Sequence, residues 1–318
     1  MLKAPKFWYK KKDTYLSILL YPLSLLFRFG TKVRNLISNK KKSNVPIICI
    51  GNIVVGGAGK TPVSLKIGKM LLNAGYNPHF LSKGYAGLVK NSTLVESWHS
   101  PKSVGDESIL LSEVAPTWVG ENRNNSAELA EKNGGDCLIM DDGFQNPTIQ
   151  KNFSIVVINA SQEFGNKRVM PAGPLRESIN RGLSRTNLVI VIGNASNTLR
   201  KTIPTQIPII EAKFQINKET KIFKGQKITA FAGIAYPEKF FYSLEEQGAK
   251  IVKEIVYPDH HIYDENDLLN LAETANKTQS ILVSTRKDYV RIPKSYRSLV
   301  NTLDGEIVFE NESLILEI

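Results

Sequence analysis

The stretch "VPIICIGNIVVGGAGKTPV" (residues 45–63) decides the expected fold. The apolar run at 45–50 predicts a short buried strand, and apolar residues at helical spacing predict a helix over 62–74. The glycine-rich segment between them (residues 51–61, the glycine loop) ends in Gly-Lys-Thr, which is typical of loops that bind nucleotide phosphates. The amides and the positive dipole end of the following helix would face the phosphate oxygens.

The strict pattern G-x-x-x-x-G-K-[ST] is broken at Val54, where its first glycine is expected. The remaining loop still supplies glycines for close backbone approach, a lysine for the β- and γ-phosphates and a threonine for Mg²⁺. Deviant loops of membrane-associated ATPase switches carry a lysine just before the paired glycines, and Val55 occupies that position here. The predicted nucleotide-binding residues are Gly56, Gly57, Ala58, Gly59, Lys60, Thr61 and Pro62.

A second apolar strand, "DCLIMDDGFQN" (136–146), ends in two aspartates. In folds with a phosphate-binding loop, such a strand brings an aspartate to the sheet edge, where it holds Mg²⁺ opposite the loop threonine. We therefore predict a metal site formed by Thr61, Asp141 and Asp142. The alternative is a strand that simply enters an Asp-Gly turn.

The order of elements indicates an α/β fold of the P-loop NTPase type. Strand-like runs alternate with helical ones, which predicts a parallel sheet with helices on both faces. The polar stretch 193–208 then separates a second, smaller α/β lobe. We expect three parts, 1–43, 44–208 and 209–318, and leave open whether the last residues return to the core.

Charge is concentrated at the N-terminus. The chain carries a net +11, of which residues 1–43 contribute +10, so the nearly neutral body argues against a nucleic-acid partner. Residues 15–27 have one apolar face but fall short of the roughly 20 residues that span a bilayer as a helix. Phe7–Tyr9 beside Lys10–Lys12 resemble an interfacial belt.

These features favour an amphipathic helix that lies on an anionic membrane surface. A helix packed on the core would show the same periodicity, and a signal peptide would need a cleavage site that is missing after Phe29. Cys49 and Cys137 both fall in apolar strand-like runs, which indicates core residues and a cytoplasmic compartment.

Six motifs occur in a fixed order. They are "GNIVVGGAGKTPV", "LSKGYAG", "VGDESILL", "MDDGFQN", "MPAGPLRES" and "YPDHHIY". Together they resemble the tetraacyldisaccharide 4'-kinase family of lipid A synthesis, from the N-terminal helix to about residue 291. The resemblance implies a kinase that transfers the γ-phosphate of ATP, with Mg²⁺, to the 4'-hydroxyl of a tetraacylated glucosamine disaccharide 1-phosphate. It also implies a peripheral or monotopic enzyme on the cytoplasmic face of the bacterial inner membrane, and we predict no protein partner.

The resemblance also assigns roles to residues. Asp106, in Gly-Asp-Glu, would be the catalytic base, and His260, which follows Asp259, would assist it, with His261 as the alternative. Taken alone, Asp106 would be a helix cap and the histidines part of a solvated loop. Glu177 is a weaker metal candidate, and the candidate substrate contacts are Lys83, Arg123 and Arg176.

Because Asp106 and His260 fall in different predicted lobes, we expect them to meet only when the lobes close. Two other functions stay open at this point. One is a membrane-bound ATPase switch that recruits partner proteins. The other is a kinase for a soluble small molecule, which the basic amphipathic N-terminus disfavours.

Overall fold

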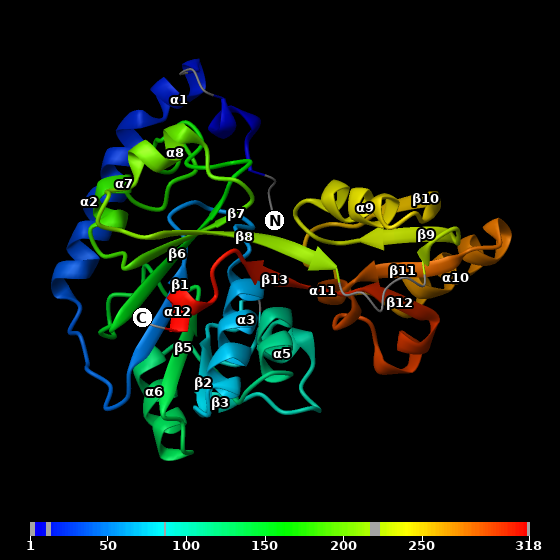
Figure 1. Ribbon diagram of the computed structural model, residues 1–318, viewed down its shortest axis with the longest axis horizontal. Helices are drawn as coiled ribbons and strands as arrows, with labels where there is room; N and C mark the ends of the chain where they lie inside the picture. Colours follow the sequence, from blue (N-terminus) through cyan, green and yellow to red (C-terminus); the bar gives the residue numbers. More distant parts are fainter. Residues whose placement is uncertain (1–3, 11–13, 86, 217–222, 317–318) are drawn as a thin grey trace.

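The computed structural model describes residues 4–10, 14–85, 87–216 and 223–316. The chain forms two sheets that lie side by side, a larger one with most of the helices and a smaller one (Figure 1). The larger sheet has nine strands in the order β13-β8-β7-β6-β1-β5-β2-β4-β3. Its strands are β1 Ile47–Gly51, β2 Pro78–Ser82, β3 Thr93–Leu94, β4 Thr117–Val119, β5 Cys137–Asp141, β6 Phe153–Asn159, β7 Leu188–Ile192, β8 Ile209–Ile216 and β13 Gly305–Phe309.

The larger sheet is parallel from β8 to β4, and only the edge strands β13 and β3 pair antiparallel. Its helices are α3 Lys60–Asn73, α4 Pro101–Val104, α5 Asp106–Ser112, α6 Arg123–Lys132, α7 Ile179–Leu183, α8 Asn197–Thr202 and α12 Ser313–Leu316. The predicted helix at 62–74 therefore begins two residues earlier than expected, within the glycine loop.

Helices cover both faces of the larger sheet, as the sequence predicts. Along β1, Ile47 and Cys49 join the apolar cluster that α6, α7 and α8 cover, whereas Ile50 joins the cluster under α3 and α5. Successive side chains of a strand point to opposite faces, so a strand buried on both faces must be apolar throughout. This explains why the central strands read as continuous apolar runs rather than alternating ones.

The smaller sheet has the order β10-β9-β11-β12 and is entirely parallel. Its elements are β9 Lys227–Ala232, α9 Pro237–Glu246, β10 Lys250–Val256, α10 Glu265–Thr278, β11 Ile281–Thr285, α11 Arg286–Tyr289, the 3-10 helix η3 Lys294–Leu299 and β12 Val300–Leu303. Ala230 packs with α9 and Phe231 packs with α10, so this sheet also has a helix on each face.

The boundary between the two sheets differs from the boundary expected at residue 208. Strand β8, which the sequence placed in the second lobe, pairs with β7 in the larger sheet. After β12 the chain returns, and β13 pairs antiparallel with β8. The smaller sheet is therefore inserted between two neighbouring strands of the larger one (Figure 1). The polar stretch at 193–208 is a connection within the larger sheet and not a boundary between lobes, because β8 follows it and pairs with β7. Its composition alone does not distinguish the two cases.

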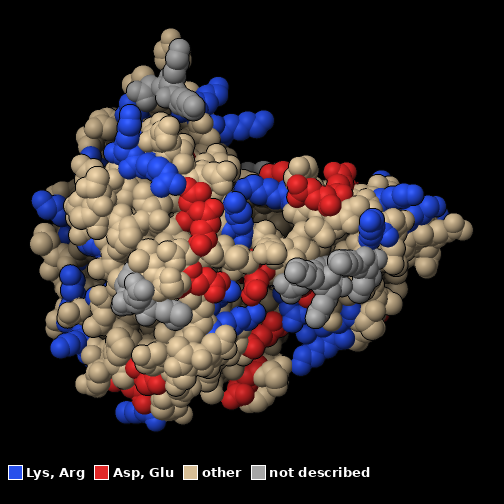
Figure 2. Space-filling model, viewed as in Figure 1, with Lys and Arg blue, Asp and Glu red and all other residues tan. Residues whose placement is uncertain are grey.

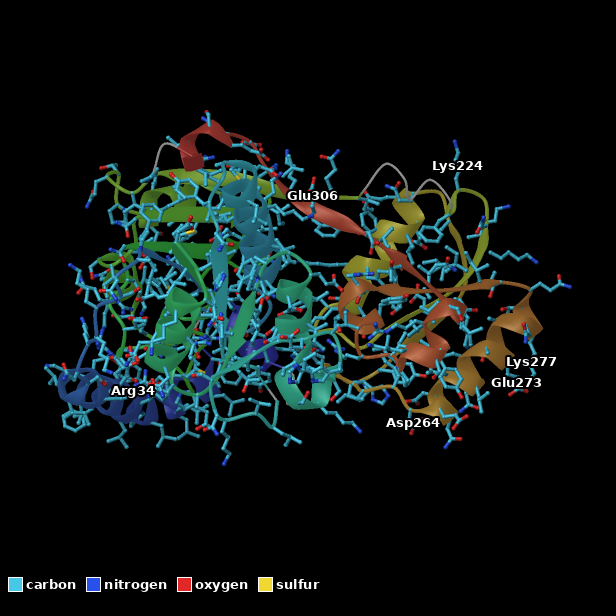
Figure 3. All side chains as sticks on the ribbon, turned by 90° about the horizontal axis from the view of Figure 1, so that it is seen from below. Arg34, Lys224, Asp264, Glu273, Lys277 and Glu306 are labelled. Atoms are coloured by element: carbon cyan, nitrogen blue, oxygen red, sulfur yellow. The ribbon has the colours of Figure 1, made fainter. Side chains whose placement is uncertain are left out.

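The N-terminal helices present their apolar side chains outward. The 3-10 helix η1 Lys6–Tyr9 is followed by α1 Tyr15–Leu19 and α2 Tyr21–Ile37, and Arg34 marks α2 at one end of the molecule in Figure 3. Ser17 and Ser24 are buried against the body, whereas Leu19 and Leu26 are 74% and 67% exposed. Ser24 Oγ donates to the carbonyl of Val169 at 2.7 Å and accepts from the amide of Ala172 at 3.1 Å.

The alternative interpretation, a helix that packs on the core through its leucines, does not match these exposed side chains. Among the described residues, no helix is long and apolar enough to cross a bilayer. Lys11 and Lys12, part of the predicted basic belt, lie outside the described residues. The buried positions of α1 and α2 are the small polar residues Ser17 and Ser24, whereas most of the leucines are exposed together with Arg28, Lys32 and Arg34.

Two helical glycines provide a test of the packing. An alanine Cβ at Gly68 in α3 would lie 2.5 Å from Cζ of the buried Phe80, whereas one at Gly30 in α2 would meet nothing within 4 Å. We expect Gly68→Ala to lower the free energy of unfolding by about 1–3 kcal/mol through overpacking. Gly30→Ala should raise it by up to about 1 kcal/mol through helix propensity. Thermal unfolding of both variants checks this, and a Gly68→Ala variant as stable as Gly30→Ala would contradict the packing described here.

Candidate active site

The glycine loop and the acidic end of β5 are brought together by strand pairing. Strand β5 is the direct parallel neighbour of β1, and Asp141 lies opposite Ile50, the residue before the loop begins. Within the loop, Gly59 is the N-cap of α3 with φ 86°, and a Cβ there would lie 2.2 Å from Cδ1 of Ile192. The positive φ favours glycine here, and any larger residue would also have to displace the end of the Ile192 side chain. The structure therefore places Lys60 and Thr61 in the first turn of α3, beside the end of β5.

Asp141 is the buried carboxylate of this site. It accepts a hydrogen bond from Thr61 Oγ1 at 3.2 Å and one from Ser64 Oγ at 2.8 Å. Burial raises the pKa of Asp141 to about 6, and the nearby charge of Glu107 adds to the rise. A buried carboxylate of this kind gains most from a cation that compensates its charge.

Asp142 is held by cations. Its Oδ1 lies 3.6 Å from Lys60 Nζ and 2.9 Å from Arg176 Nη1. Burial acts to raise the pKa of Asp142, but Lys60 and Arg176 outweigh it, and the pKa lies below its ordinary value. The predicted phosphate lysine is thus already positioned at the acidic strand end by a neighbouring carboxylate.

The donor set suits Mg²⁺ bound together with a nucleotide. Among the described residues, no group of three or more His, Cys, Asp or Glu side chains could hold a metal by itself. Mg²⁺ usually binds one or two carboxylates and completes its shell with water and substrate phosphates. The Thr61 hydroxyl beside the Asp141 carboxylate, with Asp142 next in sequence, provides such a partial shell.

Glu177 differs from the other predicted metal residues in its surroundings. Its buried carboxylate lies 2.5 Å from Arg185 Nη2 and 3.8 Å from Arg181 Nε, and it accepts from Gln145 Nε2 at 3.2 Å. Gln145 also accepts from Arg176. Two arginines thus compensate the charge of Glu177, and Gln145 links its carboxylate to Arg176.

The structure brings Asp106 and His260 together. Asp106 begins α5 directly after Gly105 (φ 84°), and His260 Nδ1 lies 3.1 Å from Asp106 Oδ2. The Tyr85 ring lies beside the His260 ring, with centroids 5.6 Å apart. His261 instead contacts Asp267 through Nε2 at 2.7 Å. The two residues therefore meet between the larger and the smaller sheet, and in this conformation they are in contact. That closure of the lobes completes the site stays a prediction.

Arg291 is a member of this cluster that sequence reasoning missed. Its Nε donates to Asp106 Oδ2 at 2.7 Å, and its Nη2 lies 2.7 Å from the same oxygen. Burial alone would raise the pKa of Asp106, but His260, Lys287 and Arg291 outweigh it and hold the pKa well below its usual range. The only sequence signal was the i, i+3 spacing of Arg291 from Asp288 in the turn after a strand.

The predicted substrate residues lie in three different environments. Lys83 is exposed just after β2. Arg176 binds Asp142, as described. Arg123 is only 3% exposed, and its Nη2 donates to the carbonyl of Asp141 at 3.3 Å. Burial lowers the pKa of Arg123 to about 10. Arg123 therefore hydrogen-bonds the backbone at the acidic strand end, and its side chain is not accessible to a substrate in this structure.

Tyr236 and Tyr9 lie against the glycine loop, although the sequence analysis assigned no role to Tyr236 and placed Tyr9 in the interfacial belt. A Cβ at Gly57 would lie 3.7 Å from the Tyr236 ring, and one at Gly56 would lie 3.7 Å from the Tyr236 hydroxyl and 4.0 Å from the Tyr9 hydroxyl. Burial raises the pKa of Tyr9, and Tyr236 contributes to the rise. Figure 2 shows acidic and basic side chains gathered where the larger and smaller parts of the molecule meet.

Comparisons with known proteins show which family the chain belongs to. The model of the tetraacyldisaccharide-1-P 4'-kinase family matches residues 16–316. The chain is 41% identical to a tetraacyldisaccharide 4'-kinase from Paramagnetospirillum magneticum, over 99% of this chain and 97% of that protein. It is 39% identical to one from Rhodospirillum rubrum, over 97% and 94% of the two chains.

A solved structure shares the fold. It is the "apo" form of LpxK from Aquifex aeolicus in complex with ATP, with a TM-score of 0.77 at 23% identity, covering 95% of this chain and 98% of that one. The family match spans nearly the whole chain, and the glycine loop, the acidic strand end and the Asp106–His260 pair all lie within it. This chain belongs to the tetraacyldisaccharide-1-P 4'-kinase family.

Proposed function

We propose that this protein uses ATP to phosphorylate the 4'-hydroxyl of a tetraacylated glucosamine disaccharide 1-phosphate at the cytoplasmic face of the inner membrane. The observation that carries the proposal is the position of the Asp106–His260 pair at the start of α5, the helix that packs against α3, which begins in the glycine loop. Glu107, which directly follows Asp106, is close enough to Asp141 to raise its pKa. A hydroxyl bound at Asp106 would therefore lie near a nucleotide whose phosphates occupy the glycine loop.

Each residue has a defined part in the proposed reaction. The acceptor oxygen attacks the γ-phosphorus, the new O–P bond forms, the bond to the β-phosphate oxygen breaks, and the hydroxyl proton passes to the Asp106 carboxylate. Lys60 and the loop amides would stabilise the phosphate charge. Mg²⁺ held at Thr61 and the two aspartates would neutralise further charge on the phosphates.

The low pKa of Asp106 is compatible with this role. A carboxylate so strongly ion-paired is a weak base toward a free alcohol. Phosphoryl transfer has a loose transition state, in which positioning and charge neutralisation contribute more than early proton removal. The hydroxyl becomes acidic as its oxygen bonds to phosphorus, so an ionised, well-oriented carboxylate is sufficient to accept the proton. His260 would hold Asp106 in that orientation.

The outer face of α1 and α2 supports membrane attachment. Its exposed apolar residues are Leu16, Ile18, Leu19, Leu23, Leu25, Leu26, Phe27, Phe29, Leu36 and Ile37. Exposed apolar patches of this extent mark interaction surfaces. Together with the basic N-terminal segment, they suit an anionic membrane surface, where a lipid acceptor would be found. A kinase that acts on a soluble molecule would not need such a membrane-binding face.

The direct test is label transfer. The purified protein is incubated with γ-labelled ATP, Mg²⁺ and a tetraacyl disaccharide 1-phosphate in mixed micelles. We expect label to move to the lipid. ATP hydrolysis without labelled lipid would contradict the proposed acceptor and favour an ATPase switch, while equal transfer to a soluble glucosamine acceptor without detergent would favour a small-molecule kinase.

The neighbouring histidines provide a matched pair for the proposed catalytic roles. We expect Asp106→Asn and His260→Asn to lower kcat, Asp106→Asn by about 10²–10⁴-fold because it removes the proton acceptor. His261→Asn should leave kcat within a few-fold, since His261 contacts Asp267 and not Asp106. Steady-state kinetics with lipid and ATP varied in turn measure this. A larger loss in His261→Asn than in His260→Asn would reverse the assignment of the assisting histidine.

The membrane contact can be tested separately from catalysis. Replacing Leu19, Leu26 and Leu36 together by Ser should weaken binding to vesicles that contain anionic lipid, because each removes exposed apolar area. Leu269→Ser serves as the control, since Leu269 is 54% exposed on α10 in the smaller sheet. Vesicle co-sedimentation measures both. Equal loss in the control, or no loss in the triple variant, would contradict the assigned face.

A further inference from the structure

Arg291 connects the smaller sheet to the proposed catalytic carboxylate. It lies just after α11, its side chain is 1% exposed, and both its Nε and its Nη2 lie 2.7 Å from Asp106 Oδ2. His260 Nδ1 approaches this same oxygen at 3.1 Å. Asp106 Oδ1, by contrast, accepts only from the amide of Glu107 among the contacts of the described residues. The two carboxylate oxygens are thus distinguished, and Oδ1 retains capacity for a further donor.

The guanidinium itself is fixed by a buried acceptor. Arg291 Nη1 lies 3.1 Å from Oδ1 of Asp288, which is 0% exposed. Asp288 also accepts from the Gly233 amide at 2.9 Å and from the hydroxyls of Tyr263 at 2.9 Å and Thr285 at 2.6 Å. Because so many donors hold Asp288, its carboxylate is a rigid support for Arg291. The planar fork of arginine can then contact both carboxylates in a fixed geometry.

Arg291 and His260 share one further partner. The carbonyl of Gly233 accepts from Arg291 Nη1 at 2.7 Å and from the His260 amide at 3.1 Å. His260 adopts φ 61°, a conformation that residues other than glycine adopt only when their surroundings enforce it. A single guanidinium therefore contacts the carboxylate directly and helps to fix the backbone segment that presents the histidine.

Arg291 also affects the protonation of Asp106 through its charge. His260, from the loop after β10, and Arg291, from the segment after β11, contact Asp106 directly, and the charge of Lys287 also acts on it. Each of these three groups has an acidic partner of its own, namely Asp259 for His260, Asp288 for Arg291 and Glu107 for Lys287. Lys287 Nζ pairs with Glu107 at 3.1 Å, which leaves Arg291 as the cation in direct contact with Asp106. Without Arg291, burial would act on Asp106 with less opposition and favour its protonated form.

We propose that Arg291 is a positioning residue for phosphoryl transfer, whose guanidinium binds Oδ2 of Asp106 so that Oδ1 is left to accept the hydrogen bond of the acceptor hydroxyl. This inference rests on the proposed function of Asp106. The Arg291–Asp106 ion pair joins the smaller part of the molecule to the larger one. The orientation of the Asp106 carboxylate therefore depends on the relative position of the two sheets.

The test is a double-mutant cycle on label transfer to the lipid. Arg291→Gln should lower kcat by about 100-fold through misplacement of the carboxylate, with the KM for ATP within a few-fold of wild type. In an Asp106→Asn background, Arg291→Gln should cause little further loss, because it acts through Asp106. Arg291→Lys, which keeps the charge but not the fork, should fall between wild type and Arg291→Gln.

A pH profile separates positioning from a general loss of structure. In Arg291→Gln the acid limb of kcat should move to higher pH by about one unit or more, since the loss of a contacting cation raises the pKa of Asp106. In Arg291→Lys the acid limb should stay near that of wild type. If Arg291→Gln does not fold, the double-mutant cycle is measured with Arg291→Lys in its place, alone and combined with Asp106→Asn.

Arg297→Gln is the matched control. Arg297 belongs to the same segment and donates to the carbonyls of Ile292 and Val290. Among the described residues, its side chain makes no hydrogen bond or ion pair with Asp106. Its loss should leave kcat and the acid limb close to those of wild type. Equal effects of Arg297→Gln and Arg291→Gln, or full additivity with Asp106→Asn, would overturn the role of Arg291. A wild-type protein that transfers no label to the lipid would instead contradict the proposed function.

Discussion

The parallel pairing of β1 with β5 is the constraint on which the site depends. It sets Asp141 opposite Ile50 and so brings a buried carboxylate to the residue before the glycine loop. Carboxyl ends of neighbouring parallel strands meet at one edge of a sheet, and helix α3 starts at that same edge. Thr61, Ser64 and Lys60 reach the acidic strand end because they occupy the first turns of α3.

The second constraint is a set of ion pairs between the two sheets. Arg291 and His260 from the smaller sheet contact Asp106 of the larger one, and Lys287 contacts Glu107. Buried ion pairs of this kind contribute little net stability, because desolvation of the charges opposes their attraction. They do fix geometry, since an unpaired buried charge is strongly unfavourable. The cluster is therefore better understood as a device for orientation than as a source of stability.

The N-terminal helices reverse the usual arrangement of a surface helix. Their buried positions are serines, and Ser24 is hydrogen-bonded on both sides to the segment that follows β6. That same segment carries Arg176 and Glu177 toward the acidic strand end. Helix α2 and the site thus share one supporting loop. The membrane contact proposed for the apolar outer face would place this loop, and with it one side of the site, next to the membrane surface.

The sequence by itself determined the local elements of the site. The strand, glycine loop and helix at 45–74, the acidic strand end at Asp141 and the apolar character of α1 and α2 follow from periodicity and residue type, which act over a few residues. The ordered motifs also indicated the family. The roles of Asp106 and His260 were inferred from that resemblance, and the structure places the two side chains in contact.

Only the tertiary structure decided the remaining points. Which histidine faces Asp106, that Glu177 is compensated by arginines, that Arg123 is buried and that Arg291 joins the cluster all depend on contacts between residues far apart in the chain. The pairing of β8 with β13 joins residues about ninety positions apart around an inserted sheet, and no local pattern encodes such a partner. Periodicity states that a face is apolar, but the direction in which that face points is set by what packs against its opposite side.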